Sequence, residues 1–188
     1  MNTRSQSGAS NTVSRPSAAD SALCFRPAAQ GDHGQLVRLL KEARTFLRDS
    51  GVDQWQGSYP NEETLRADIA DGNGWVLTLN GEICAYFYIA YQMEEYQRHI
   101  DGAWKTNLPC ASIHRLMVDN RLKGRGLGAL CLSHAESLCR ERGIDSIKTD
   151  TDKDNLPMQR VLEKMGYVYC GTVTFDSSSK IAFEKVLE

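Results

Sequence analysis

The stretch SIHRLMVDNRLKGRGLGALCLSHAESL, residues 112–138, joins a strand, a basic glycine-rich loop and a helix without interruption. The strand is the apolar run Ile113, Leu116, Met117 and Val118, which the turn-forming pair Asp119-Asn120 ends. Apolar residues then recur at helical spacing: Leu127, Leu130, Cys131, Ala135 and Leu138. Between strand and helix lie Lys123, Gly124, Arg125, Gly126 and Gly128. Because glycines let backbone N–H groups approach a ligand and helix N-termini attract anions, the stretch predicts a phosphate-binding loop.

Two common phosphate-binding motifs fit this loop poorly. The spacing Gly124-x-Gly126-x-x-Ala129 satisfies a loose dinucleotide fingerprint, with Asp145 downstream for a ribose. In that fold, however, the first glycine lies at the end of the strand, whereas residues 119–123 intervene here. Too little chain follows to complete a doubly wound sheet, and no Gly-Lys-Ser/Thr closes a P-loop. A solvated turn without a ligand is the remaining alternative.

Two segments resemble motifs of the GNAT acetyltransferase superfamily. Val118 followed by residues 123–128, KGRGLG, is similar to motif A, Gln/Arg-x-x-Gly-x-Gly/Ala after a strand, with Lys123 at the Gln/Arg position. Residues 155–167, NLPMQRVLEKMGY, resemble motif B, with these residues in register: Asn155, Lys164, Gly166 and Tyr167. The chain departs from motif B at Leu162, where most members carry the tyrosine thought to protonate the CoA thiolate. The resemblance covers roughly residues 23–187.

The resemblance implies a fold, a cosubstrate and a reaction. The expected fold is α/β, a mixed central sheet with a splayed strand pair and helices on both faces. Acetyl-CoA would donate its acetyl group directly to a primary amine of a small molecule or protein, and a backbone N–H near Met117 or Val118 would hold the oxyanion. The expected cofactor-binding residues are Leu116, Met117, Val118, Lys123, Gly124, Arg125, Gly126, Leu127, Gly128 and Asn155. A catalytically weakened acyl-CoA-binding regulatory module is the alternative, and Leu162 is its main support.

Because an alkylammonium has a pKa of about 10, direct transfer requires either a base that removes a proton or a site that favours the small neutral fraction of the amine. The candidates are His114, placed on the same strand face as Leu116 and Val118, and Asp150 and Asp152 at the end of the following strand. A lone strand histidine is more often a core residue, and residues 150–154 could form a solvated turn or a helix cap. Tyr167, Tyr169 or a water could protonate the thiolate in place of Leu162. Because a thiol has a pKa of about 8.5, its anion can leave without that proton. We therefore expect an enzyme that is slower but still active.

Two irregular segments are candidates for the acceptor site. The polar loop over residues 51–60 carries Trp55 and Tyr59, which either form a substrate wall or, in the case of Trp55, fill the core beneath the loop. Residues 93–109 are charged, include Trp104, and form either a lid or surface decoration. Neither segment defines the chemical class of the acceptor.

The remaining elements follow from local signals. Strands are predicted over residues 23–28, 144–149, 167–172 and 180–187, and a hairpin over residues 75–91 around Asn80-Gly81, which suits a type I′ turn. A helix over residues 35–48 is expected to begin with an Asp32–Gln35 capping box. Asn61 should cap a helix over residues 62–70, and a further helix should span residues 155–165 with its proline in the first turn.

Composition limits the remaining possibilities. With 188 residues and a net charge of −2, the chain is large enough for one acyltransferase domain, residues 22–188, and has no general attraction for nucleic acid or membranes. Residues 1–21 should be a disordered tail. The six cysteines show no metal-ligand spacing, so we expect free thiols, a cytoplasmic protein and no metal. Acetyl-CoA and an amine acceptor are the expected partners; a homodimer is left open.

Overall fold

The computed structural model of the protein describes residues 23–175 and 177–187. The predicted disordered tail, residues 1–21, lies outside them. The six cysteines are free thiols, as the sequence predicts. Among the described helices, none has the length and apolar character needed to cross a bilayer.

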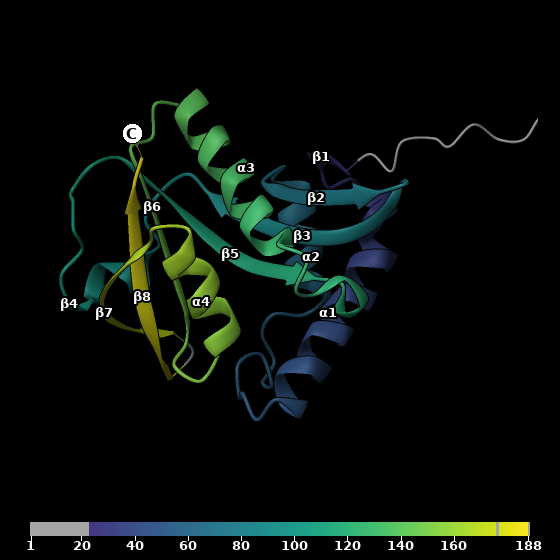
Figure 1. Ribbon diagram of the computed structural model, residues 1–188, viewed down its shortest axis with the longest axis horizontal. Helices are drawn as coiled ribbons and strands as arrows, with labels where there is room; N and C mark the ends of the chain where they lie inside the picture. Colours follow the sequence, from purple (N-terminus) through teal and green to yellow (C-terminus); the bar gives the residue numbers. More distant parts are fainter. Residues whose placement is uncertain (1–22, 176, 188) are drawn as a thin grey trace, which may run out of the picture.

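One mixed sheet of eight strands organises the fold, in the order β1-β2-β3-β5-β6-β8-β7-β4 (Figure 1). The strands are β1 (Leu23–Pro27), β2 (Gly74–Leu79), β3 (Glu82–Ala90), β4 (Asp101–Gly102), β5 (Cys110–Val118), β6 (Ser146–Asp152), β7 (Val168–Phe175) and β8 (Ser178–Val186). Only the β5–β6 pair is parallel. Asn80 and Gly81 have φ angles of 54° and 85°, which confirms the predicted hairpin turn between β2 and β3.

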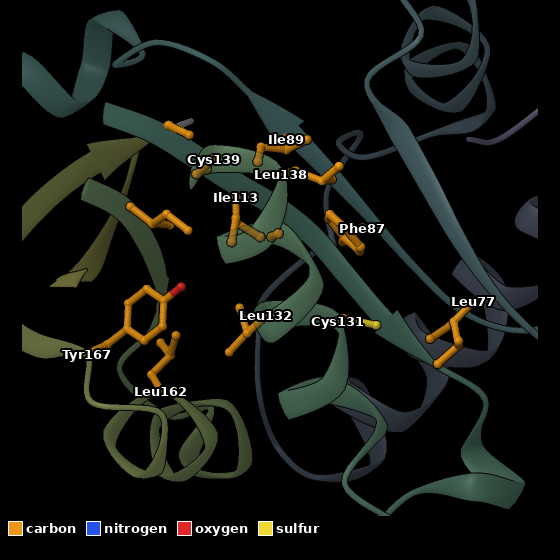
Figure 2. Close-up of a cluster of buried hydrophobic side chains, with 14 of the residues drawn as sticks. Leu77, Phe87, Ile89, Ile113, Cys131, Leu132, Leu138, Cys139, Leu162 and Tyr167 are labelled. Carbon is orange, nitrogen blue, oxygen red and sulfur yellow. The ribbon is translucent and has the colours of Figure 1, made fainter. Parts of the chain in front are cut away.

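Helices cover both faces of the sheet, which confirms the expected fold class. The helices are α1 (His33–Asp49), α2 (Glu62–Ala70), α3 (Leu127–Glu141) and α4 (Leu156–Lys164), with a short 3₁₀ turn, η2 (Glu95–His99), before β4. One core cluster joins α3 and α4 to the sheet through side chains such as Leu132, Leu162 and Phe87 (Figure 2). The second joins α1 and α2 to the other face through Leu36, Leu65 and Tyr86.

The central strands β5 and β6 separate partway along their length, which confirms the expected splayed pair (Figure 1). They pair from Cys110 opposite Ser146 to Ile113 opposite Thr149, where the Thr149 hydroxyl donates to the Ile113 carbonyl at 3.0 Å. Beyond this point β5 continues beside β3 and β6 beside β8. The edge of β5 that faced β6 therefore has no strand partner there.

A β-bulge in β5 interrupts the expected alternation of its side chains. His114 pairs with Tyr88 and Met117 with Tyr86, so two residues of β5 oppose one residue of β3. Arg115, in the bulge, has a φ angle of 53°. The prediction that His114 shares a face with Leu116 and Val118 is therefore wrong, because its partner Tyr88 lies two residues from Tyr86, the partner of Met117, which places His114 on the face of Met117.

The two predicted helix caps have different outcomes. Asn61 accepts from the Thr64 N–H at 3.0 Å and caps α2 as predicted. The capping box at Asp32 and Gln35 is wrong, because the Asp32 carboxylate binds the Arg26 guanidinium at 2.6 and 2.8 Å. A bidentate ion pair outweighs a single bond to a helix N–H, and α1 instead begins at His33.

Candidate active site

A cavity of about 1000 Å³ occupies the gap between the splayed strands. It extends from the glycine loop and α4 at one end to β5, β6, β7 and η2 at the other. Nine of the ten residues predicted to bind the cofactor line it: Leu116, Met117, Val118, Lys123, Gly124, Gly126, Leu127, Gly128 and Asn155. Arg125 does not, and lies with Glu82 and Asp119 around a separate, smaller hollow.

The glycine loop has the geometry expected for an anion site. Gly124 and Gly126 have φ angles of 77° and 80°, a conformation that other residues adopt only under strain. Gly126 is the N-cap of α3, and its carbonyl accepts the first helical bond from Leu130 at 3.0 Å. The N–H groups of residues 127–129 precede that bond and therefore have no acceptor within the helix. They lie at the cavity, where the positive end of the helix dipole favours a negative ligand.

Three cationic side chains line the cavity at this end: Lys123, Arg160 and Lys164. The Lys123 ammonium lies over the ring of Phe46, and burial lowers its pKa to about 8. An anionic group placed beside Lys123 would oppose that effect and stabilise the charged lysine. This end of the cavity is therefore suited to a polyphosphate.

Asn155 lines the cavity and also supports its wall. The Asn155 side chain accepts from the Met158 N–H at 3.3 Å, which caps α4, and donates to the Gln54 side chain at 2.8 Å. Gln54 also accepts from the Thr151 hydroxyl at 3.3 Å. Because Gln54 belongs to the loop over residues 51–60, these bonds connect that loop to β6 and α4 across the gap.

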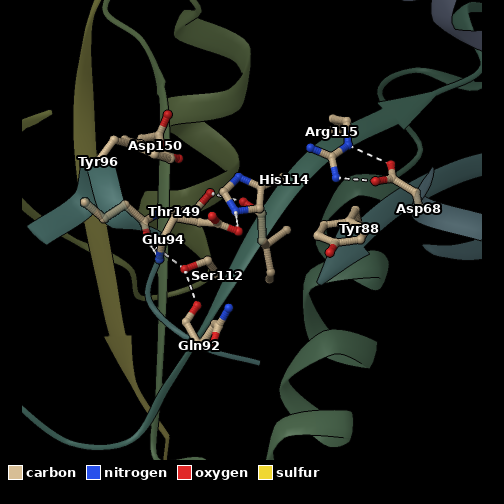
Figure 3. A network of polar contacts seen from close by, with 12 residues as sticks. Asp68, Tyr88, Gln92, Glu94, Tyr96, Ser112, His114, Arg115, Thr149 and Asp150 are labelled. Carbon is tan, nitrogen blue, oxygen red and sulfur yellow. Dashed lines mark hydrogen bonds and ion pairs between the residues drawn. The ribbon is translucent and has the colours of Figure 1, made fainter. Parts of the chain in front are cut away.

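His114 and Asp150 are the first residues beyond the last β5–β6 pair, one on each separated strand. His114 is largely buried, and its Nε2 has no hydrogen-bond partner and lies 3.7 Å from a carboxylate oxygen of Glu94 (Figure 3). Burial lowers the pKa of His114 to about 3, and the neighbouring Arg115 acts in the same direction. His114 is therefore neutral at physiological pH.

Asp150 has a different environment. Its carboxylate accepts a hydrogen bond from the Tyr96 hydroxyl at 2.5 Å and lines the cavity. Burial raises the pKa of Asp150, although the bond from Tyr96 opposes that rise. Asp152, the other carboxylate proposed from the sequence, does not line the cavity. It pairs with Lys180 at 3.1 Å and accepts from the Asp154 N–H at 3.0 Å.

Glu94 and Tyr96, which contact His114 and Asp150, were missed by the sequence analysis. Both come from the segment over residues 93–109, which therefore forms a wall of the cavity. The fully buried Gln97 fixes this segment, because its side-chain oxygen accepts from the Ser112 hydroxyl at 2.6 Å and from the Glu94 N–H at 3.1 Å. No sequence motif marks these contacts.

Arg115 and Asp68 form a second polar group that the sequence did not reveal. The Arg115 guanidinium binds both carboxylate oxygens of Asp68, at 2.6 and 2.8 Å, and both side chains are buried (Figure 3). Tyr86 donates to the same carboxylate at 2.6 Å. Arg115 also donates to the hydroxyl of Tyr59 and lies 4.3 Å from the ring centre of Tyr88.

Trp55 and Tyr59 both line the cavity, as their interpretation as a substrate wall requires. Trp55 also packs against the core cluster of α1 and α2, so the two alternatives for this residue are compatible. The ring of Tyr59 packs against Phe175 of β7, with ring centres 5.1 Å apart.

The tyrosines considered as thiolate acids lie outside the cavity. Tyr167 is 3% exposed within the core cluster of α3 and α4, and its hydroxyl has no hydrogen-bond partner there (Figure 2). Burial raises the pKa of Tyr167 well above its ordinary value. Tyr169 is largely exposed and packs on Phe183. Leu162 is fully buried in the same cluster, and the structure does not bring Tyr167, the candidate acid, to the cavity.

Comparisons with known proteins agree with this geometry. The model of the acetyltransferase (GNAT) family matches residues 37–167. An uncharacterized N-acetyltransferase, YesJ, of Bacillus subtilis is 28% identical over 161 residues, which cover 85% of this chain and 87% of YesJ. The streptothricin acetyltransferase of Streptomyces lavendulae is 23% identical over 128 residues, 68% of this chain and 58% of that protein.

Solved structures show the same fold. A GNAT acetyltransferase from Streptococcus agalactiae superposes with a TM-score of 0.81 at 31% identity, covering 88% of this chain and 96% of that one. An aminoglycoside acetyltransferase in complex with coenzyme A superposes with a TM-score of 0.63 at 21% identity, covering 88% of this chain and 95% of that one.

Proposed function

The chain belongs to the GNAT family of acetyltransferases, and we propose that its cavity places acetyl-CoA along the glycine loop and α4 and an amine beside Asp150 and His114. The protein is an N-acetyltransferase that moves an acetyl group from CoA to an amine. The observation that carries the proposal is the position of His114 and Asp150 where β5 and β6 separate, in the same cavity as the glycine loop.

The residues at the end of the cavity that holds the glycine loop fit a CoA pyrophosphate. The N–H groups of residues 127–129 and the backbone of Gly124 and Gly126 would donate to the phosphate oxygens. Lys123, Arg160 and Lys164 would supply positive charge. The open edge of β5 would contact the pantetheine, with a backbone N–H near Met117 or Val118 holding the oxyanion.

Asp150 is the group we assign to proton removal from the amine. A base with a raised pKa retains a proton better than one with a lowered pKa, so Asp150 is better suited than His114, whose pKa is about 3. Neutral His114 would accept a hydrogen bond from the amine through the unpartnered Nε2 and orient it. The bond from Tyr96 holds the Asp150 carboxylate in position.

The CoA thiolate can leave without an acid from position 162. A thiol has a pKa of about 8.5, so its anion is tolerable near neutral pH. Leu162 and Tyr167 lie in a hydrophobic cluster and donate no proton to the cavity. Turnover of this chain therefore does not require the missing tyrosine, and we expect the reaction to be slower than with an acid present.

Substitution of the N-cap glycine tests the cavity assignment. Gly126→Glu introduces a carboxylate, and a side chain with strained φ, where the pyrophosphate should lie. We expect the KM for acetyl-CoA to rise at least tenfold (about 1.4 kcal/mol), measured by thiol release with an amine present in excess. Gly143→Glu is the matched control, because Gly143 also has positive φ and open space but lies after α3. An unchanged KM in Gly126→Glu would contradict the assignment.

A further inference from the structure

Six side chains with planar π systems line the cavity at the end away from the glycine loop. They contact one another in a closed circuit. In order around the circuit they are Tyr59, Phe175, Tyr96, His114, Tyr88 and Arg115. Neighbouring ring centres are 4.8 to 6.4 Å apart, and the Arg115 guanidinium lies 4.3 Å from Tyr88 and 5.9 Å from Tyr59. Faces of aromatic rings attract cations, and the rings of Phe175 and Tyr96, which Arg115 does not cover, are suited to an alkylammonium.

The charges around the circuit also favour a cation. Arg115 is neutralised by Asp68, and Lys180 pairs with Asp152. Within residues 23–175 and 177–187, the only ion-pair partner found for Glu94 is His114, which burial keeps neutral. Glu94 therefore brings to the cavity a carboxylate that pairs with no lysine or arginine of the described residues.

The reacting nitrogen must lose its proton before it attacks, and we assign that proton to Asp150. Glu94 and the aromatic circuit are then left to stabilise a charge that is retained. That charge would lie on a second group of the same acceptor. The first nitrogen would lie between His114 and Asp150, and the second between Glu94 and the rings.

We propose that the acceptor is an alkyl diamine or a comparable polycationic amine, whose second cationic group is held by Glu94 and the aromatic circuit. This inference rests on the proposed function, because it assumes that the amine reacts beside Asp150. It makes Glu94 and Phe175 specificity-determining residues. A neutral alkylamine would lose the contact with Glu94, and an amino acid would place its carboxylate against that residue.

Three acceptors with the same five-carbon chain test the proposal: 1,5-diaminopentane, n-pentylamine and 5-aminopentanoate. Their second ends are cationic, neutral and anionic. With the full chain and saturating acetyl-CoA, we expect kcat/KM to fall about tenfold from the diamine to the monoamine and further for the amino acid. Equal values for the diamine and the monoamine would overturn the proposal and leave the acetyltransferase assignment intact.

Glu94→Gln isolates the charge, because it keeps the size of the side chain. We expect it to reduce the preference for the diamine over n-pentylamine about tenfold. Glu95→Gln is the matched control, since Glu95 is the next residue, is exposed, and pairs with Arg98 at 3.3 Å outside the cavity. Phe175→Leu should weaken the same preference by removing one ring face. An undiminished preference in Glu94→Gln would contradict the assignment of Glu94.

Binding of pentyltrimethylammonium separates this inference from catalysis. This cation has no N–H to acetylate, so calorimetry with the full chain reports the cation site whether or not the protein turns over. We expect it to bind the native protein at least tenfold more tightly than Glu94→Gln and to compete with the diamine but not with acetyl-CoA. Equal affinity for the native protein and Glu94→Gln would overturn the proposal, even if amines are acetylated. Glu94-dependent binding without turnover would support it and contradict the catalytic assignment.

Discussion

At the scale of single residues, the environment of each ionisable group decides its role. His114 and Asp150 lie on facing strands, but burial has opposite consequences for them. It lowers the pKa of His114 because imidazolium is the charged form, and it raises the pKa of Asp150 because carboxylate is the charged form. The carboxylate therefore becomes the stronger base and the imidazole the weaker one.

The pH profile of Asp150→Asn should reveal the base. Asp150 must be deprotonated to accept a proton, so kcat/KM in the native protein should rise with pH through a pKa above the ordinary value of about 3.9. We expect Asp150→Asn to lose this acidic limb and about 10²- to 10⁴-fold in kcat. Asp154→Asn is the control, since Asp154 is exposed, pairs with Lys153 and lies outside the cavity. An acidic limb that persists in Asp150→Asn would assign the titration to another group.

Leu162→Tyr should not restore an acid. Leu162 is fully buried in the core cluster, so the larger side chain would overpack it and bury a hydroxyl without a partner. We expect a loss of about 1–3 kcal/mol in the free energy of unfolding, measured in urea, and no gain in kcat. Leu162→Met should cost less, because it preserves volume. A stable variant with faster turnover would show that position 162 reaches the cavity.

At the scale of elements, a buried ion pair anchors the wall that carries Glu94 and Tyr96. Glu184 of β8 binds Lys148 of β6 at 2.9 Å, with both side chains fully buried, and also accepts from the Lys105 N–H and the Thr106 hydroxyl, each at 2.6 Å. Burial alone would raise the pKa of Glu184, but the bonds from Thr106 and Lys148 lower it overall. The segment over residues 93–109 is thus held at both Gln97 and Thr106.

Glu184→Gln should leave the Lys148 ammonium buried without a countercharge. We expect a loss of about 3–5 kcal/mol in the free energy of unfolding, and the double variant Lys148→Met/Glu184→Gln should lose less. Because the folded pKa of Glu184 is lowered, its contribution is present above the unfolded pKa of about 4.3 and is lost as pH falls through the folded value. Urea denaturation of native protein and variants at pH 7 and below pH 4 checks this. Equal losses at both pH values would exclude the ion pair as the cause.

At the scale of the whole molecule, the splayed strands divide the sheet into two halves, which α3 and α4 bridge on one face through a shared core cluster. The halves meet along the four β5–β6 pairs from Cys110–Ser146 to Ile113–Thr149. Beyond them, Gln54 reaches Thr151 and Asn155, and Tyr96 reaches Asp150. The cavity lies in the gap that remains, so a ligand there contacts both halves.

The sequence predicted what local signals specify. The glycines of the loop, the Asn61 cap and the Asn80-Gly81 turn each act within a few residues, and the structure confirms these elements. The sequence did not predict contacts between distant residues, such as Arg115 with Asp68 and Tyr96 with Asp150. The bulge at Arg115 was also missed, because no glycine marks its positive φ angle. Asp32 was wrongly predicted to cap a helix, because its partner Arg26 lies in the preceding strand and is not part of the capping pattern.

Acetyl-CoA should stabilise the whole fold, because it would join the two halves of the sheet. A ligand at about a hundred times its Kd adds roughly 2.7 kcal/mol to the free energy of unfolding. For a chain of this size, that corresponds to a rise of about 5–10 °C in Tm, measured by thermal unfolding. Adenosine lacks the pyrophosphate and the pantetheine, so it should give no comparable rise, and Gly126→Glu should lose the effect of acetyl-CoA. An equal rise with adenosine would show that the stabilising contacts lie outside the glycine loop and the gap between β5 and β6.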